Sequence, residues 1–420
     1  MATAPLRLGY LVPQFPGQTH IFFWREIAEL ERRGVRVHLM STRPPPAGLI
    51  AHSWSEAAMA RTDYLGRINL LNALRALPRL PLAALRRHPE PRAFWRDVLL
   101  AAPAALRLVE TARRHGLDHV HVHSCARAAL VAALSRAMGG PGYSLTLHGP
   151  LSDYGPGQRY KWSNAAFATV ITEKLIGEVR AALAGSLPER ILCQPMGVDT
   201  DALARPAPYE PPVPGGPLRL FSCGRLNPVK GHQDLMQAVA HLRAGGRDVR
   251  LDIAGEDDAG GSGYHGVLAA RIAELGLSDH VRLLGAIDAE AVRRGLLAAD
   301  VFVLASHAEP LGVAYMEAMA CGVPTIGTDA GGVPELITDG VHGLLAPPQD
   351  PRALAGTIAR LADDPALARR LSDAGRARVV ERFRAGIGAE TLVAAIEGGI
   401  DARNASGTGG AGAHSGTASA

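Results

Sequence analysis

Lysine, cysteine and long apolar runs are all scarce in this chain of 420 residues. Only Lys161, Lys174 and Lys230 are lysines, and the other basic residues are arginines. The four cysteines have no paired spacing, so the sequence suggests neither a disulfide framework nor a zinc site. The sequence contains no signal-peptide pattern and no uncharged apolar stretch near the length of a membrane span. We therefore expect a cytoplasmic protein.

Composition and length indicate a globular protein of two domains. Apolar residues make up 47% of the chain and charged residues 20%, which leaves ample material for a core. The net charge of +4 is too small to argue for a nucleic-acid partner by itself.

Short apolar runs alternate with helical patterns, which is typical of parallel sheets covered on both faces. The predicted strands of the first half are Leu6–Val12, Val35–Met40, His119–His123, Tyr143–Leu147, Ala168–Thr172 and Arg190–Gln194. Those of the second half are Leu218–Cys223, Val249–Ala254, Val281–Leu284, Asp300–Ala305, Thr325–Gly327 and Gly343–Leu345.

A proline-rich segment separates the two halves. Six prolines fall within residues 206–217, where neither a helix nor a central strand can continue. We predict an N-terminal domain over 1–200, a linker over 201–217, a second domain over 218–385 and a C-terminal helix over 386–402. Residues 403–420, rich in Gly, Ser, Ala and Thr, are predicted to be disordered.

Residues 61–116 interleave eleven arginines with leucine-rich runs. Such a pattern would suit contact with an anionic membrane surface. The competing interpretation is ordinary helices on the first sheet, and it is slightly favoured because prolines at 78, 81, 89 and 91 divide the segment into short pieces.

The most informative segment runs from Glu309 to Pro324, after a predicted buried strand. Gly312 stands at the expected start of a helix, a position that favours anions, while Glu309 and Glu317 flank it. Carboxylates suit hydroxyl groups better than phosphate. The segment therefore predicts a ligand that carries both a phosphate and a sugar.

A second loop supplies cations. Arg225 leaves the carboxyl end of a predicted strand, and Lys230 stands before the next helix, where ligands dock in open α/β sheets. The pair is suited to clamping a diphosphate, although the spacing is not that of a Walker loop. An ordinary charged loop is the alternative.

Several other motifs favour structural roles. Asp199-Thr-Asp201 imitates a metal signature, but a turn is the better interpretation. The alternating histidines 119, 121 and 123 share one face of a strand, where packing or cleft lining is more probable than metal binding. Cys125 and Cys321 fit buried positions better than nucleophilic ones.

Taken together, these motifs resemble the retaining family 4 glycosyltransferases of GT-B fold, over roughly residues 6 to 385. Gly224-Arg-Leu with Lys230-Gly231, Glu309 with Glu317, and the glycines at 331, 332, 340 and 343 carry the match. Phe15-Pro16 before Thr19-His-Ile-Phe, with Glu26-Ile-Ala-Glu-Leu, resembles the exopolysaccharide-biosynthesis branch. The resemblance implies two Rossmann-like, doubly wound α/β domains with a cleft between them.

The resemblance also implies roles for particular residues. Arg225 and Lys230 would hold the diphosphate of a nucleotide-sugar, and Glu317 would bind the ribose. Glu309 and His148 would lie near the transferred sugar, with backbone N–H groups from Gly312 and Val313. The loop of Gly17, Gln18 and Thr19 would approach the phosphate or the acceptor. No metal or other cofactor is implied, and a covalent intermediate at Glu309 is not predicted.

Three departures from the family pattern concern the site. Pro310-Leu311 replaces the family's usual Gly-Phe after Glu309, and the first loop, often rich in glycine, has only Gly17 within residues 14–19. The loop of residues 256–265 is longer and more acidic than usual. The implied activity is transfer of a sugar to a saccharide, which we expect to be lipid-linked. Alternatives are an epimerase or phosphorylase of the same fold, or a non-catalytic saccharide-binding subunit of an export complex.

Overall fold

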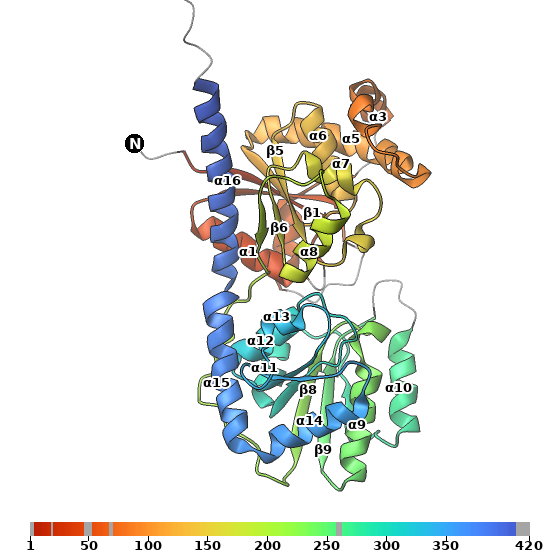
Figure 1. The fold of residues 1–420 in the computed structure, drawn as a ribbon, viewed down its shortest axis with the longest axis vertical. Helices are drawn as coiled ribbons and strands as arrows, with labels where there is room; N and C mark the ends of the chain where they lie inside the picture. The colour runs from red at the N-terminus through yellow and green to blue at the C-terminus, as the bar shows by residue number, and fades with distance from the viewer. Residues whose placement is uncertain (1–3, 18–19, 46–52, 67–69, 258–262, 409–420) are drawn as a thin grey trace, which may run out of the picture.

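The computed structural model describes residues 4–17, 20–45, 53–66, 70–257 and 263–408. Two parallel sheets form the centres of two domains, which are stacked along the long axis of the molecule (Figure 1). This architecture is the predicted α/β, doubly wound one. Among the described residues, no helix is both long and apolar enough to cross a bilayer.

The first sheet has seven parallel strands in the order β3-β2-β1-β4-β5-β6-β7. All its strand pairs are parallel, and β4 is buried along its whole length, as expected for a sheet with both faces covered. The strands are β1 (Arg7–Gln14), β2 (Arg36–Arg43), β3 (Thr62–Tyr64), β4 (His119–Val122), β5 (Gly142–Leu147), β6 (Ala168–Val170) and β7 (Ile191–Cys193).

The second sheet has six parallel strands in the order β10-β9-β8-β11-β12-β13. Its order reverses between β8 and β11, a switch point at which ligands bind in open α/β sheets. The strands are β8 (Leu218–Cys223), β9 (Val249–Ala254), β10 (Val281–Leu283), β11 (Val301–Val303), β12 (Thr325–Thr328) and β13 (Leu344–Ala346).

Every predicted strand is present within a few residues of its predicted bounds, and among the described residues the short edge strand β3 is the one that was not predicted. Three residues are too few for an alternation pattern to show. Expecting only short helices between residues 61 and 116 was wrong for one element, because α5 continues through Pro103 as a helix of 24 residues.

Helices cover both faces of the two sheets. Those that follow the strands of the first sheet are α1 (Ile21–Arg32), α2 (Ser55–Arg61), α3 (Leu70–Ala76), α4 (Leu82–Leu85), α5 (Arg92–His115), α6 (Arg127–Ala137), α7 (Gln158–Ser163) and α8 (Glu173–Ala182). The later ones are α9 (His232–Ala244), α10 (Tyr264–Glu274), α11 (Ala289–Ala298), α12 (Val313–Ala320), α13 (Val333–Leu336), α14 (Pro351–Asp363), α15 (Pro365–Arg382) and α16 (Ala385–Thr408).

The chain crosses between the domains twice, and the two crossings lie against each other. Val198 donates to the carbonyl of Phe383 at 2.9 Å and accepts from the N–H of Ala385 at 3.0 Å. A Cβ atom on Gly197 would lie only 2.4 Å from the Ala385 nitrogen, so the close approach requires glycine there.

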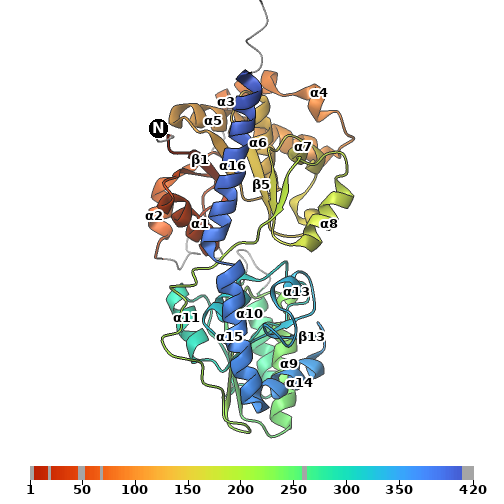
Figure 2. The same ribbon diagram turned by 60° about the vertical axis from the view of Figure 1, so that its left-hand side comes forward.

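After the second crossing, α16 packs on α1 of the first domain, so that α15 and α16 run along one side of both domains (Figure 2). This helix continues to Thr408, beyond the predicted end at residue 402. Residues 409–420 of the predicted tail lie outside the described part of the chain.

Candidate active site

A cavity with about 200 Å³ of free volume, open to solvent, lies between the two domains. Its lining combines Ile21 and Arg25 from α1 with residues at the carboxyl ends of the second sheet's strands, among them Arg225, Val313 and Glu317. A partly enclosed cavity with an apolar lining and a few convergent charges is suited to a small organic ligand.

The predicted cation and carboxylate meet directly. Lys230, in a short 3₁₀ turn (Pro228–Lys230) after β8, donates from Nζ to Oε2 of Glu309. Ser306 donates to the same carboxylate oxygen at 3.1 Å. Because Glu309 is only 7% exposed, these two donors compensate for the burial of its charge.

The turn between Glu309 and α12 has the form that the sequence predicted. Gly312 precedes the helix with φ of 97°, a conformation that L side chains rarely adopt. The N–H groups of the first turn of α12 have no acceptor within the helix, since none lies on the N-terminal side. Val313 lines the cavity, so this helix end faces the space in which a ligand would bind.

Glu317 is engaged by a residue of the other domain. Its Oε1 atom lies 2.8 Å from a guanidinium nitrogen of Arg25, and the two side chains are only 16% and 13% exposed. This ion pair spans the cleft at the carboxylate for which the family resemblance implied a ribose partner.

His148 lies at the end of β5, on the first-domain side of the cleft. It is partly exposed, and the rings of Phe22 and Phe23 lie against it with centroids 5.8 and 5.6 Å away. A Cβ atom on the next residue, Gly149, would lie 3.7 Å from Pro310 Cγ of the second domain. The structure thus brings His148 to the segment that contains Glu309.

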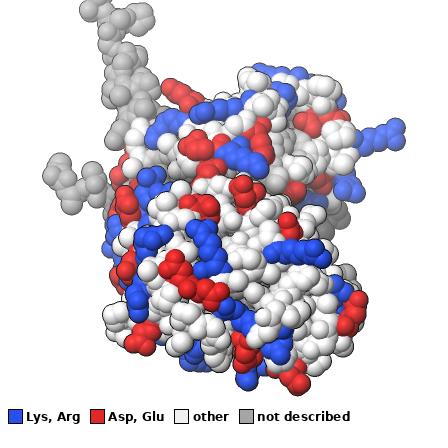
Figure 3. All heavy atoms as spheres, turned by 60° about the horizontal axis from the view of Figure 1, so that its bottom comes forward, with Lys and Arg blue, Asp and Glu red and all other residues white. Residues whose placement is uncertain are grey.

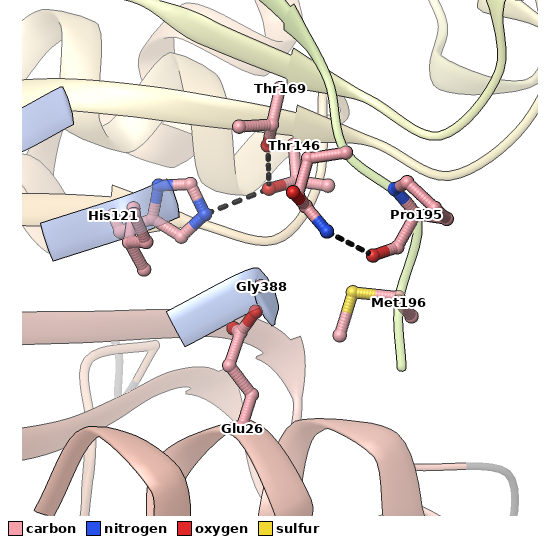
Figure 4. A pocket seen from close by; sticks show the side chains of 9 residues that line it. Glu26, His121, Thr146, Thr169, Pro195, Met196 and Gly388 are labelled. Atoms are coloured by element: carbon pink, nitrogen blue, oxygen red, sulfur yellow. Dashed lines mark hydrogen bonds between the residues drawn. The ribbon is translucent and has the colours of Figure 1, made fainter. Parts of the chain in front are cut away.

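A second, much smaller cavity lies between the first sheet, α1 and α16, and its free volume of about 10 Å³ leaves room for about one water molecule. Figure 4 shows Glu26 of α1 pointing toward it from one side, with His121 and Thr146 of the first sheet on the other and Gly388 of α16 above the carboxylate. Burial lowers the pKa of His123 to about 3, and burial together with His123 lowers the pKa of His148 to about 3. Both imidazoles are therefore neutral at physiological pH.

The described part of the first loop includes Gly17. Gly17 lies beside the ring of His20, and its carbonyl accepts a hydrogen bond from the His20 N–H at 3.0 Å. Gln18 and Thr19 lie outside the described residues, as do residues 258–262 of the acidic loop. The described end of that loop places Glu256 in the lining of the larger cavity.

The structural roles predicted for residues 199–201 and for the buried histidines are confirmed. Asp199 accepts hydrogen bonds from the N–H groups of Asp201 and Ala202 at 3.2 and 3.0 Å, which is a turn. His119 and His121 are buried and bonded to Ser144 at 2.8 and 2.7 Å.

The two cysteines weighed as nucleophiles are both buried. Burial raises the pKa of both thiols, to about 12 for Cys321. They are therefore unreactive at neutral pH.

Within the described part of the chain, His38, Asp63 and His115 form the single cluster with metal-like geometry. His38 already bonds to Asp63 at 2.9 Å. The cluster lies toward the amino ends of the first sheet's strands, away from the cleft. It has no role in the site.

Comparison with known proteins agrees with this geometry. Residues 208–378 match the family "Glycosyl transferases group 1". Over 393 residues, the chain is 30% identical to a 2-deoxystreptamine glucosyltransferase of Streptomyces kanamyceticus, covering 91% of this chain and 92% of the relative. An amylovoran biosynthesis glycosyltransferase of Erwinia amylovora is 35% identical over 187 residues, or 43% of this chain and 45% of that protein.

Among solved structures, Anabaena HepE in complex with UDP and glucose superposes with a TM-score of 0.73 at 19% identity. The superposition covers 94% of this chain and all of the other. The fold is that of the two-domain, GT-B glycosyltransferases. The chain belongs to the group 1 glycosyltransferases, family 4 of that fold.

Sequence reasoning missed one charged residue of the cleft, Arg25, and the apolar wall of the larger cavity. That wall is formed by Leu203, Ala286, Ile287, Ala289 and Val292. Arg25 directly precedes Glu26, the first residue of the motif on α1, but nothing in the sequence indicates which second-domain residue it would meet. The wall comes from Leu203 and from residues 286–292, two segments far apart in sequence, so no local pattern reveals it.

Proposed function

We propose that this enzyme transfers a hexose from a nucleoside diphosphate sugar to a saccharide acceptor with retention of anomeric configuration. Residues 218–385 would hold the donor and residues 1–200 the acceptor, with the chemistry in the cleft. A lipid-linked acceptor and a role in exopolysaccharide biosynthesis are part of the proposal. The similarity to the amylovoran biosynthesis enzyme supports the biosynthetic role.

The observation that carries the proposal is the division of the larger cavity by chemistry. Arg225 supplies positive charge at the end of β8, Glu317 offers a carboxylate on α12, and an apolar wall adjoins both. These features match a diphosphate, a ribose and a base in turn. The UDP and glucose bound by Anabaena HepE are consistent with a donor of this class.

The position of Glu309 supports a mechanism without a covalent glycosyl-enzyme. Lys230 and Ser306 both donate to its Oε2 atom, so the carboxylate is held as a hydrogen-bond acceptor. In the proposed step the bond from C1 to the diphosphate oxygen breaks as the bond to the acceptor oxygen forms on the same face. The proton of the acceptor hydroxyl passes to the departing phosphate, whose charge Arg225 and Lys230 stabilise.

A panel of UDP- and GDP-sugars tests the donor assignment, because a bound ligand raises the thermal midpoint by mass action. The donor that stabilises the protein is then incubated with saccharide acceptors, and the anomeric configuration of the product is read by NMR. An inverted product would contradict retention. Epimerised donor formed without acceptor would favour the epimerase alternative.

Peripheral membrane contact is a second part of the proposal. The described large apolar residues that are exposed are concentrated in residues 74–100, where Leu74 is 60% and Leu99 57% exposed. The segment also carries arginines, and basic residues beside exposed leucines favour an anionic bilayer surface. On the second-domain face that Figure 3 brings forward, by contrast, both charge signs are interspersed.

Co-sedimentation with vesicles of anionic and of neutral lipid tests this contact. Leu74→Ser with Leu99→Ser should weaken binding to anionic vesicles, whereas Val267→Ser, at a site 46% exposed on α10, should not. Equal binding of all variants, or none by the wild type, would leave the arginines as ordinary surface residues.

A further inference from the structure

A chain of buried polar groups leads from α1 to His148. Nε2 of His123 lies 3.0 Å from Oε2 of Glu26, and Nδ1 of His123 lies 3.4 Å from Nε2 of His148. The distance between His123 and Glu26 is within the range of an ion pair, but its angles are outside those of a hydrogen bond. Glu26 is 7% exposed and His123 3%, so water does not compete strongly for these contacts.

The chain has a direction because its groups differ in what they can donate. An ionised carboxylate only accepts hydrogen bonds, and a neutral imidazole has one donor and one acceptor nitrogen. With Glu26 ionised, His123 places its proton on Nε2, facing the carboxylate. Its Nδ1 atom then accepts, so His148 places its own proton on Nε2 and keeps Nδ1 unprotonated.

We propose that Glu26 and His123 are positioning residues that fix this tautomer of His148 and present its Nδ1 atom as an acceptor for a sugar hydroxyl. The proposal rests on the glycosyl transfer proposed above for its substrate, but the tautomer itself does not depend on that activity. His148 would be the residue that touches substrate.

Neighbouring groups hold Glu26 in place for this role. Tyr10 donates from its hydroxyl to Oε2 at 2.7 Å, and its ring lies against His123 with centroids 4.3 Å apart. On the other side, a Cβ atom on Gly388 of α16 would lie 3.2 Å from Oε1 of Glu26. The carboxylate is thus confined between β1, α1 and α16, and a bulkier neighbour at position 388 would push against it.

Packing alone is the competing explanation, since buried histidines usually form hydrogen bonds with neighbouring buried groups without any further role. His119 and His121 fit that explanation, because their bonds run to Ser144 and Thr146. His123 differs from them, because its two ring nitrogens face the carboxylate of Glu26 on one side and the cleft residue His148 on the other. A purely structural role would not require a particular tautomer at His148.

The test uses the full-length protein labelled with ¹⁵N-histidine, at pH 8. Nitrogen shifts distinguish a protonated from an unprotonated ring nitrogen, and a His148→Gln variant assigns the His148 signals. In the wild type, Nε2 of His148 should be protonated. Glu26→Gln, which can donate from its amide, should reverse the tautomer or mix the two forms.

The matched control is Tyr10→Phe, which removes a hydrogen bond to Glu26 but leaves the carboxylate. It should keep the wild-type tautomer. In kinetics, Glu26→Gln should lower kcat roughly 10-fold, as expected for losing one well-placed hydrogen bond to substrate. The Kd for the nucleotide should stay within about twofold, because none of the contacts from Glu26 to His148 involves the residues proposed to hold the diphosphate.

An unchanged His148 tautomer in Glu26→Gln, or the same change in Tyr10→Phe, would overturn the proposal. So would a wild-type His148 protonated on Nδ1. If the tautomers behave as expected but no nucleotide-sugar is bound or consumed, the proposed function fails while the positioning chain stands. The two failures can therefore be told apart.

Discussion

Arg25 on α1 and Glu317 on α12 form an ion pair of 2.8 Å that joins the two domains across the cleft. A second contact joins the domains nearby: the carboxylate of Glu335 accepts from the backbone N–H groups of Glu173 and Lys174, at 2.8 and 3.0 Å. These two N–H groups begin α8, where a carboxylate is favoured by the helix dipole. Both contacts thus join the two domains in the described conformation.

Removing the first contact should favour opening of the cleft. Arg25→Ala should shift the population toward open conformations several-fold, as expected for losing a pair worth roughly 1 kcal/mol. Domain separation in the nucleotide-free protein can be followed by small-angle scattering or by fluorescence transfer between labels. The control is Arg32→Ala on the same helix, whose pair with Glu29 is exposed and within one domain. Equal opening in both variants would show that the ion pair of Arg25 with Glu317 does not stabilise the described arrangement of the domains.

Loss of the cation or of the ribose carboxylate should abolish transfer while the fold persists. Lys230→Ala removes the donor to Glu309 and the proposed phosphate contact, and Glu317→Ala removes the proposed ribose contact. We expect nucleotide affinity to fall at least about 10-fold in each, the usual cost of one charge-assisted hydrogen bond. Calorimetric titration with the preferred nucleotide measures it. Unchanged affinity in both variants would exclude the assignment, provided circular dichroism shows an intact fold.

Acid should destabilise the protein from about pH 6.5 downward. His123 and His148 have pKa values lowered to about 3, and burial lowers the pKa of His232 to about 4. Between these pKa values and pH 6.5 the unfolded chain binds protons that the folded chain does not. The free energy of unfolding therefore decreases as the pH is lowered, by about 1.4 kcal/mol per pH unit for each such group. The raised pKa of Glu26 acts in the opposite sense, because the folded carboxyl keeps its proton to higher pH.

Urea midpoints at pH 7.5 and 5.5 measure this dependence. His232→Gln should make it shallower, while His265→Gln, at an exposed position, should leave the slope as in the wild type. A midpoint that does not change between the two pH values would contradict the neutral, buried state of these histidines.

The turn before α12 should tolerate no side chain. At Gly312, with φ of 97°, a Cβ atom would lie 2.4 Å from the ring of Tyr315, so Gly312→Ala should destabilise the protein by roughly 1–3 kcal/mol. Tyr315 cannot move away easily, since its hydroxyl donates to the Leu304 carbonyl at 2.7 Å.

Gly356→Ala is the matched control for that substitution. Gly356 lies within α14, and no heavy atom is near the carbon that the substitution adds. Gly356→Ala should therefore raise the free energy of unfolding by roughly 0.5–1 kcal/mol. Denaturant unfolding compares the two variants. Equal effects would show that the turn is not strained by a side chain.

The sequence by itself determined the alternation of strands and helices, the division into two sheets and most of the second-domain site. Strand periodicity and glycine turns are local properties, and Arg225, Lys230, Gly312 and Glu317 all follow strands whose carboxyl ends share an edge. Local pattern was therefore sufficient to predict that these residues would gather.

Only the tertiary structure decided which residues meet across the cleft and which helix belongs to which domain. The pairing of Arg25 with Glu317 and the chain from Glu26 to His148 join segments far apart in sequence. The packing of α16 on α1 depends on a second crossing of the chain at Ala385. Charge and polarity at a single position do not encode a partner; the relative placement of the two domains does.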